Sequence, residues 1–286
     1  MIRRVLLLVA CICAAVALYA QYQPNPAWNV PATPHRVIGN VYYVGSTELT
    51  SLAIATPQGV ILIDTGLEET VPIIRSGLQK LGLQYSDIRI LLNSQAHYDH
   101  AAGLARVKRD TGARVEAMGP DAALLEAGGR GDFRFGDELT FPPVKVDRVL
   151  KDGDIVELGG VTVTARHTPG HTKGATTFVT TAEDGGRKFN VVFATSLSVN
   201  AGTSLLDNRN YPTIVSDWEK TYQLLKSLTP DVWVSSHAGF FDMKGKSARL
   251  GTSPNPYIDP AGYRHYVESG ERQFRKLLAE EGSRQH

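Results

Sequence analysis

Cysteine is nearly absent from this chain of 286 residues, which has only two. Both of them, Cys11 and Cys13, lie in the first twenty residues. An excess of charge of one sign is also absent, since 30 Lys and Arg stand against 29 Asp and Glu. Nucleic-acid-binding proteins usually carry a basic excess, and polybasic segments mark proteins that bind membrane surfaces. The charge balance therefore argues against both classes.

The composition lacks the features of a disordered chain. Apolar residues make up 42% and charged residues 21%, which are ordinary values for a globular protein. No segment is rich enough in Gly and Ser to act as a linker between domains, and no short repeat is evident. The length is ample for a sizeable buried core. We therefore expect one large domain.

The first twenty residues have the pattern of a secretory signal peptide. Arg3 and Arg4 precede an apolar run over residues 5–18, and small residues end it, with cleavage expected after Ala17 or Ala20. We predict a cleaved signal over residues 1–20, a single domain over residues 21–286, and a periplasmic or secreted protein. An uncleaved membrane anchor stays an alternative, because the run is only slightly short of a spanning helix. The segment Leu8–Cys11 also resembles a lipoprotein signal, but this alternative is weaker because the apolar run continues past the cysteine.

Removal of this signal would also remove both cysteines and two positive charges. The remaining chain would have 28 basic and 29 acidic residues, a formal net charge of −1. It could form no disulfide and would have no cysteine nucleophile or cysteine metal ligand. An exported protein of this kind must be stable without covalent cross-links.

The remaining sequence alternates strand patterns with helix patterns. Residues 21–35 are rich in Pro, Asn and Gln and are expected to form an extended arm. Helical spacing of apolar residues predicts helices over 70–81, 104–110, 216–227 and 263–278. Strands are predicted over 37–44, 51–55, 60–64, 88–93, 113–118, 149–150, 155–158, 161–165, 176–180, 191–193 and 232–235. Residues 128–143 are expected to form a long loop. This order predicts an α/β sandwich, in which two mixed sheets pack face to face with helices on the outside.

Histidine gathers directly after the strand predicted to end at residue 93. His97, Asp99 and His100 place two imidazoles and one carboxylate within four positions, a set of donors that suits divalent zinc. Two more histidines also follow predicted strands: His171 in the segment T-P-G-H-T, and His237 in S-S-H-A-G. Three histidine-bearing loops at strand ends can meet on one edge of a sandwich. The other histidines do not share this context: His167 is expected to support the site or the fold, and His35, His265 and His286 to lie on the surface.

These motifs resemble those of the metallo-β-lactamase superfamily, whose pattern is H-x-H-x-D-H followed by two separate histidines. Asp64 opens a D-T-G turn after a buried strand, as in that superfamily. More narrowly, the chain is similar to subclass B3, since subclasses B1 and B2 use a cysteine ligand. The resemblance covers about residues 35–280 and implies an αβ/βα sandwich with the metals at one edge.

The resemblance implies up to two zinc ions. It assigns Gln95, His97 and His171 to the first zinc, and Asp99, His100 and His237 to the second. Gln95 stands where the family motif has its first histidine, a departure that some B3 members share. An amide is a poorer zinc ligand than an imidazole, and the second set also carries a negative charge. We therefore predict that the second site binds zinc more tightly than the first.

The segment between His171 and His237 bears on the substrate. Thioesterases and lactonases of this superfamily usually place a bridging Asp there, but no carboxylate occurs over residues 193–206. The resemblance to β-lactamases implies that Ser196 and Ser198 hold the substrate carboxylate, whereas a plain S-x-S turn is the alternative. It also implies that a zinc-bound hydroxide opens the β-lactam ring, with Asp99 as the residue that orients it.

Three functions are therefore kept in view. The first is zinc-dependent hydrolysis of β-lactam antibiotics, a small-molecule substrate class that implies antibiotic resistance. The second is a zinc-dependent thioester or lactone hydrolase of the same superfamily. The third is an exported zinc-binding protein without catalysis, which Gln95 favours slightly. We expect a monomer, with no nucleic-acid partner and no membrane contact after signal cleavage.

Overall fold

The computed structural model describes residues 25–252 and 254–284, and these form two β-sheets with helices on the outside. The predicted signal peptide at residues 1–20, and the prediction for His286, lie outside the described residues. Within the described residues, no helix has the length and apolar character needed to cross a membrane. The two sheets confirm the predicted α/β sandwich.

The first sheet has seven strands in the order of the sequence. They are β1 (His35–Ile38), β2 (Val41–Tyr43), β3 (Leu52–Thr56), β4 (Gly59–Ile63), β5 (Ile88–Leu92), β6 (Arg114–Met118) and β7 (Arg148–Leu150). Pairing is antiparallel from β1 to β4 and parallel from β4 to β7. The carboxyl ends of β4 and β5 therefore lie at the same edge of the sheet.

The second sheet has five strands in the order β12-β11-β10-β9-β8. They are β8 (Ile155–Leu158), β9 (Val161–His167), β10 (Thr176–Asp184), β11 (Arg187–Ala194) and β12 (Val232–Ser235). Only β11 and β12 pair in parallel; the other neighbours are antiparallel. Ala194 pairs with Ser235, so β11 and β12 end side by side.

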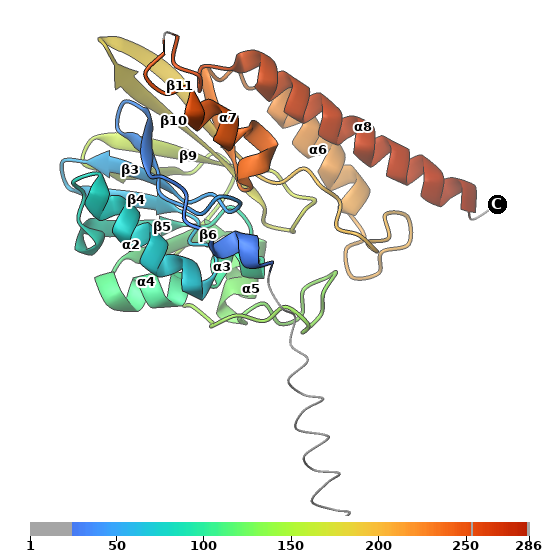
Figure 1. Ribbon diagram of the computed structural model, residues 1–286. Coiled ribbons are helices and arrows are strands. Elements are labelled where there is room, and N and C mark those ends of the chain that lie inside the picture. The colour runs from blue at the N-terminus through green and yellow to red at the C-terminus, as the bar shows by residue number, and fades with distance from the viewer. Residues whose placement is uncertain (1–24, 253, 285–286) are drawn as a thin grey trace, which may run out of the picture.

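Helices cover the outer faces of both sheets. Figure 1 shows α2 (Val71–Lys80) and α4 (Leu104–Thr111) beside the first sheet, and α6 (Ile214–Ser227) and α8 (Pro260–Arg284) on the opposite side of the molecule. Shorter helices are α3 (Tyr98–Ala101), α5 (Gly119–Glu126) and α7 (Met243–Ala248). Four 3-10 helices, Pro26–Asn29, Glu68–Thr70, Tyr85–Asp87 and Ala238–Phe241, complete the described elements.

The strand β4 shows how the sequence divides its side chains between two apolar cores. Successive side chains of a strand point to opposite faces of the sheet. Ile61 and Ile63 pack in the core between the two sheets, whereas Val60 and Leu62 pack in the core beneath α2 and α4. All four are fully buried, which explains why β4 has a continuous apolar run rather than an alternating one.

The helix α2 follows directly from its apolar spacing. Val71, Ile74 and Leu78 recur at helical intervals and are buried against the first sheet. Leu81 ends the helix, and Gly82 follows with φ of +77°, a conformation that glycine adopts easily. The structure thus confirms the predicted helix over residues 70–81 almost to its ends.

Some local predictions were wrong. His35 was expected on the surface, but it is only 8% exposed, because its ring stacks on Tyr43 and its Nε2 lies 2.5 Å from the hydroxyl of Tyr257. The expected extended arm over 21–35 contains a 3-10 helix at Pro26–Asn29, which the side chain of Asn25 caps. His265 is exposed, as predicted.

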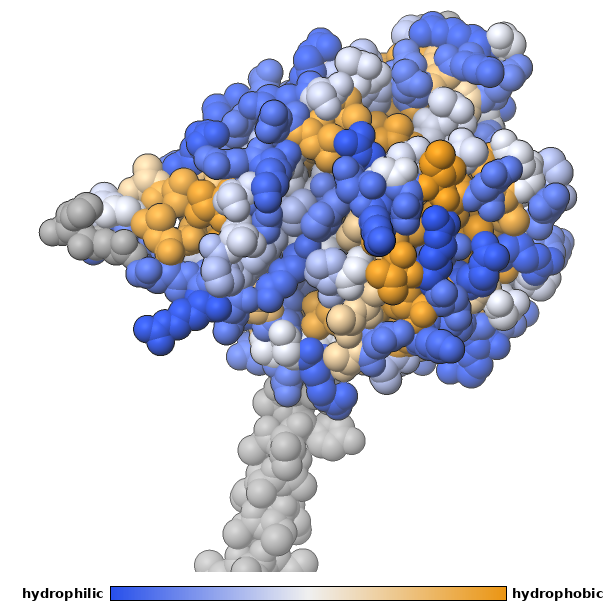
Figure 2. Space-filling view, turned by 180° about the vertical axis from the view of Figure 1, so that it is seen from behind, coloured by the Kyte–Doolittle hydropathy of each residue, from blue (hydrophilic) through white to orange (hydrophobic). Residues whose placement is uncertain are grey.

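The 128–143 loop is confirmed as a segment without helix or strand between α5 and β7. Figure 2 shows one face of the molecule, which is largely hydrophilic and on which apolar residues form separate patches. Among the described residues, the exposed large apolar side chains are Val30, Val149, Ile155, Leu206, Phe240 and Leu250.

Candidate metal centre

The predicted ligands follow strand ends that meet at one edge of the sandwich. Gln95, His97, Asp99 and His100 come after β5, where α3 begins directly behind His97. His171 follows β9, and His237 follows β12. Ring contacts between histidines from different loops confirm that the three loops converge: His97 lies against His171, and His100 against His237.

The second predicted set forms a compact cluster. Asp99, His100 and His237 each offer one ligand atom, and these three atoms lie within 4.8 Å of one another. Asp99 Oδ2 is 3.2 Å from His100 Nε2 and 3.4 Å from His237 Nε2, and the two imidazole nitrogens are 3.3 Å apart. His100 is fully buried, whereas the side chains of Asp99 and His237 are 17% and 24% exposed, so the cluster is reachable from solvent.

Two members of the first predicted set also face each other. His97 Nδ1 lies 3.2 Å from His171 Nε2, and both residues are buried. The outer ring nitrogen of His171 donates to the backbone carbonyl of Ser198 at 2.7 Å. This hydrogen bond fixes the tautomer in which Nε2 has a free lone pair, as a metal ligand requires.

Gln95 has a different environment from these histidines. Its side-chain oxygen accepts weak hydrogen bonds, both at 3.4 Å, from the hydroxyl of Thr195 and the backbone amide of Ser196. Its amide nitrogen is buried and has no hydrogen-bond partner in the described part of the chain. The oxygen, the atom that binds cations, is therefore shared with the end of β11.

Asp64 supports the cluster from the end of β4. It is fully buried and adopts φ of +57°, which is unusual for a residue other than glycine. Its carboxylate accepts from Ser94 N at 2.7 Å, Ser94 Oγ at 2.5 Å and Asn93 Nδ2 at 3.2 Å. Its Oδ2 also lies 3.6 Å from His100 Nδ1. Asp64 therefore holds both the loop after β5 and the orientation of the His100 ring.

Electrostatics divide the histidines into one that holds a proton and two that do not. Burial lowers the pKa of His100, but the carboxylates of Asp99 and Asp64 outweigh it and raise that pKa to about 10. Burial, reinforced by a neighbouring imidazole, lowers the pKa of His171 to about 3 and that of His237 to about 4. Burial by itself raises the pKa of Asp99, yet the imidazoles of His100 and His237 hold it below the usual range. Asp99 is therefore a carboxylate at neutral pH, beside a protonated His100 and a neutral His237.

This donor set fits a divalent cation such as zinc. Imidazole nitrogens and a carboxylate oxygen are common zinc ligands. Two pairs of buried imidazole nitrogens face each other, His97 Nδ1 with His171 Nε2 at 3.2 Å and His100 Nε2 with His237 Nε2 at 3.3 Å, as ligands around a cation do. A cation shared between Asp99, His100 and His237 would also relieve the close approach of two imidazole nitrogens.

Ser196 and Ser198 differ in their accessibility. Ser196 is fully buried, and its hydroxyl lies 2.7 Å from the hydroxyl of Ser236. Ser198 is partly exposed, and its carbonyl oxygen accepts from His171. Both lie in the segment that reaches the metal ligands, but of the two only Ser198 is accessible from solvent. Their role in binding a carboxylate stays a prediction.

Sequence reasoning missed two buried aspartates that support the ligands. Asp121 accepts from Ala96 N at 2.8 Å, from Thr172 Oγ1 at 2.6 Å and from Gly174 N at 2.7 Å, so it connects the loop of His97 to the loop of His171. Burial raises the pKa of the Asp121 carboxyl, although these hydrogen bonds act to lower it. Asp132 faces His97 from the 128–143 loop. Both residues are acidic and lie in segments between the predicted ligand loops. Nothing in the sequence showed which backbone or side-chain groups Asp121 and Asp132 contact.

Known proteins resemble this chain over most of its length. Residues 39–237 match the family described as the metallo-beta-lactamase superfamily. The structure of the FEZ-1 metallo-beta-lactamase from Legionella gormanii is 41% identical, with a TM-score of 0.88, and the match covers 91% of this chain and 99% of that one. The class B3 di-zinc metallo-beta-lactamase LRA-12, from an Alaskan soil metagenome, is 34% identical, with a TM-score of 0.85, over 89% of this chain and 97% of that one.

Curated relatives match over shorter segments. A protein of Burkholderia pseudomallei named as a probable metallo-hydrolase is 32% identical over 94 residues, which are 33% of this chain and only about a third, 32%, of that protein. An acyl-coenzyme A thioesterase of Gallus gallus is 28% identical over 196 residues, which are 62% of this chain and 64% of that protein. Similarity therefore extends to more than one kind of hydrolase.

Proposed function

The chain belongs to the metallo-beta-lactamase superfamily, and from this we propose that it hydrolyses the β-lactam ring with zinc as its cofactor. Its close structural neighbours are metallo-beta-lactamases, and one of them is a class B3 enzyme. The observation that carries the proposal is the convergence of Asp99, His100 and His237 beside the pair His97 and His171. The superfamily includes several kinds of hydrolase, so the substrate has to be inferred from the site residues and not from the fold.

The residues that would hold the metal follow from the geometry above. Asp99, His100 and His237 would hold one zinc ion, and His97 and His171, with Gln95, would hold the other. When bound, zinc acts as a Lewis acid and lowers the pKa of a coordinated water to about 7. We propose that the Gln95 site is the weaker, because the side-chain oxygen of Gln95 is already engaged by Thr195 and Ser196.

The protein groups have defined tasks in this proposal. Asp99 is a carboxylate at neutral pH, because its neighbours hold its pKa low, and it can accept a hydrogen bond from the attacking water and so orient it. Attack on the lactam carbonyl carbon is followed by cleavage of the C–N bond, and no covalent acyl-enzyme is expected. Asp64 and the carbonyl of Ser198 keep the rings of His100 and His171 in place during this step.

Ser198 is the better placed of the two serines for binding substrate. It lies on the segment after β11 that contacts His171, and it is partly exposed. Ser196 is buried and its hydroxyl contacts that of Ser236, so it cannot contact a substrate directly in this structure. We propose that Ser198 binds the carboxylate of the substrate and that Ser196 keeps this segment in position.

A thioester hydrolase is the second candidate, and the similarity to an acyl-coenzyme A thioesterase favours it. The segment that would carry a bridging carboxylate reaches the site, because Ser196 N donates to Gln95 and Ser198 O accepts from His171. It offers hydroxyls and no carboxylate over residues 193–206. This absence favours the β-lactam over the thioester.

The substrate test offers a chromogenic cephalosporin and an acyl thioester to the purified protein. We expect turnover of the cephalosporin, and turnover of the thioester alone would contradict the proposal. His237→Ala should abolish activity, because it removes one of the three converging ligands. His265→Ala is the matched control, since that histidine is exposed on α8, and it should leave activity unchanged.

We also propose that the protein is exported and acts as a monomer. The basis for export is the signal-like pattern of residues 1–20. Fractionation of cells that express the chain tests it, and recovery of the uncleaved protein from the cytoplasm would count against export. Size-exclusion chromatography with light scattering tests the monomer.

A further inference from the structure

The tip of the 128–143 loop is a tight turn organised by one aspartate. Asp132 N donates to Gly136 O at 3.2 Å, and Gly136 N donates to Asp132 O at 2.9 Å. The side-chain oxygen Oδ1 of Asp132 accepts from Arg134 N at 2.8 Å and from Phe135 N at 2.7 Å. One carboxylate oxygen is therefore fully used to shape the turn.

The other carboxylate oxygen of Asp132 faces a metal ligand. Oδ2 lies 3.6 Å from His97 Nε2, and the side chains are only 4% and 8% exposed. Neither atom has a hydrogen-bond partner in the described part of the chain. The ring of Phe135 also packs edge-on against the His97 ring, with centroids 5.4 Å apart. The tip of the loop thus contacts His97 through both a charge and a ring.

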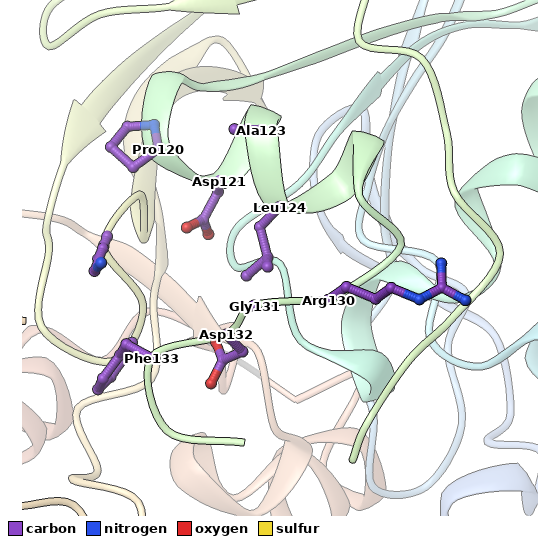
Figure 3. Close-up of a pocket in the computed structure, with 9 residues that line it drawn as sticks. Pro120, Asp121, Ala123, Leu124, Arg130, Gly131, Asp132 and Phe133 are labelled. Carbon is purple, nitrogen blue, oxygen red and sulfur yellow. The ribbon is translucent and has the colours of Figure 1, made fainter. Parts of the chain in front are cut away.

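The loop is not packed tightly onto the helix beneath it. A cavity of about 200 Å³ lies between α5 and the loop, and Figure 3 shows Asp121 of α5 and Asp132 of the loop among the residues that line it. Apart from the contacts with His97, the tip is held by Phe133 against Tyr211 and by Arg134, which donates to Ala201 O at 2.7 Å. The contacts of Asp132 and Phe135 therefore join the tip directly to His97, while Phe133 anchors it to the main core.

We propose that Asp132 is the positioning residue for His97 and couples zinc binding at the first site to the conformation of the 128–143 loop. A histidine that binds a metal through one ring nitrogen commonly has its other N–H oriented by a carboxylate. Here the carboxylate belongs to a loop rather than to a strand or helix. Because coupling between two sites is reciprocal, zinc at His97 must then stabilise the loop as much as the loop favours zinc. This inference rests on the proposed function only through the assignment of His97 as a ligand.

The variant Asp132→Asn separates the two tasks of the side chain. The amide keeps one oxygen, which can shape the turn, and it then turns an NH₂ group toward the N–H of His97. The backbone N–H groups of Arg134 and Phe135 both need an acceptor, so the amide oxygen stays with the turn and the NH₂ group faces His97. Asp137→Asn is the matched control, because Asp137 lies in the same loop, is exposed and accepts only from Gly131 N, at 2.9 Å. It removes the same charge without touching His97.

Zinc affinity is the first measurement, by competition with a chelator. His171→Ala identifies the binding step that belongs to the first site. We expect Asp132→Asn to weaken that step by about 10- to 100-fold, as is typical for loss of an outer carboxylate, and Asp137→Asn to leave it unchanged. Equal affinity of the wild type and Asp132→Asn would overturn the proposal.

Limited digestion with trypsin is the second measurement, because Arg130 and Arg134 lie in the loop. Cleavage there requires the loop to open locally. Zinc should protect these sites in the wild type and in Asp137→Asn, but not in Asp132→Asn. Protection that is the same in all three proteins would contradict the coupling. Neither measurement uses β-lactam turnover, so the inference and the proposed function can fail separately. A protein that binds zinc in two steps but does not turn over a β-lactam would refute the proposed function and leave this inference standing.

Discussion

At the scale of single residues, the metal centre depends on which donors stand at six positions. Five are histidine or aspartate, and the sixth, Gln95, is an amide whose oxygen already accepts hydrogen bonds from Thr195 and Ser196. A neutral amide is a weaker zinc ligand than an imidazole, and here it also has competing donors. The first site should therefore empty before the second when zinc is scarce.

Replacing Gln95 with histidine tests this directly. We expect Gln95→His to raise zinc affinity at the first site, on the order of tenfold, because an imidazole replaces an engaged amide. Metal analysis after mild chelation measures the zinc that each protein retains. Zinc lost first from the Asp99, His100 and His237 site of the wild type would show that the order of affinities is the reverse.

The sequence places the predicted ligands in local patterns, but it gives no such pattern for the residues that contact them. His97, Asp99 and His100 stand within four positions, and His171 and His237 follow strand ends, so a local pattern identifies them. The supports depend on long-range contacts: Asp121 lies 25 residues from Ala96 and 51 from Thr172, the groups that it accepts from. No local pattern shows that these segments meet. His35 illustrates the same limit, since its burial depends on Tyr257, 222 residues away.

At the scale of elements, most strands and the long helices were predicted and the short helices were not. The single strand predicted over 37–44 was wrong: the chain turns at Gly39, which has φ of +49°, and forms the antiparallel pair β1 and β2. The apolar spacing of α2, α4 and α6 indicated helices of nearly the observed extent, whereas α8 extends beyond the predicted 263–278 at both ends, from Pro260 to Arg284. Helix α5 was missed because Gly119 and Pro120 resemble a turn, although Pro is favoured at the start of a helix. Helices α3 and α7 have four and six residues, too few for helical periodicity to show.

The loop that carries His171 depends on close packing against α6. A side chain at Gly170 would place its Cβ 2.4 Å from Trp218 Cδ2, and Gly170 also has φ of +136°. Trp218 is fully buried and has no room to move. Gly170→Ala should lower the free energy of unfolding by about 1–3 kcal/mol, through overpacking, and weaken zinc binding by displacing His171.

Gly153→Ala is the matched control for this change. Gly153 has φ of +84°, but an added Cβ would meet nothing within 4 Å, so it carries the backbone strain without the collision. Urea denaturation of both variants separates the two effects. Equal destabilisation would show that backbone strain, and not contact with Trp218, constrains position 170.

An ion pair between Lys108 of α4 and Asp147, which directly precedes β7, predicts a pH dependence of stability. Asp147 accepts from Lys108 Nζ at 2.6 Å and from Val115 N at 2.8 Å. Burial alone would raise the pKa of Asp147, but Lys108 and the amide of Val115 hold it below its ordinary value of 3.8. The unfolded chain therefore binds this proton more readily, so the stabilisation is present above that value and is lost as the pH falls through the lower folded pKa.

Asp147→Asn should cost about 1 kcal/mol of unfolding free energy at neutral pH, and the difference from the wild type should shrink in acid. Urea denaturation at a series of pH values measures it. Glu219→Gln is the control, since Glu219 and Arg275 form an exposed pair at 3.5 Å, and it should have little effect at any pH. A cost for Asp147→Asn that is the same at neutral and acid pH would refute the role of its charge.

At the scale of the whole molecule, the predicted metal ligands come from both sheets. His97, Asp99 and His100 follow a strand of the first sheet, and His171 and His237 follow strands of the second. Bound zinc would therefore connect the two halves of the sandwich. The sequence indicated two groups of strands, but pairings such as β11 with β12 join distant segments and have no local signal.

Zinc should consequently stabilise the folded protein as a unit. A ligand that binds only the folded state adds about 2.7 kcal/mol when its free concentration is 100 times its Kd. The midpoint of thermal unfolding should rise with zinc in the wild type and rise less in His171→Ala and in His237→Ala, each of which disrupts one site. A midpoint that does not respond to zinc would mean that these residues do not form a metal centre.

The most direct test of the central claim is the turnover of a chromogenic cephalosporin by the purified protein before chelation, after chelation and after zinc is added back. The account predicts ring opening that stops when zinc is removed and returns when it is restored. Cephalosporin turnover that persists unchanged in the metal-free protein, or none with zinc fully bound, would contradict the account.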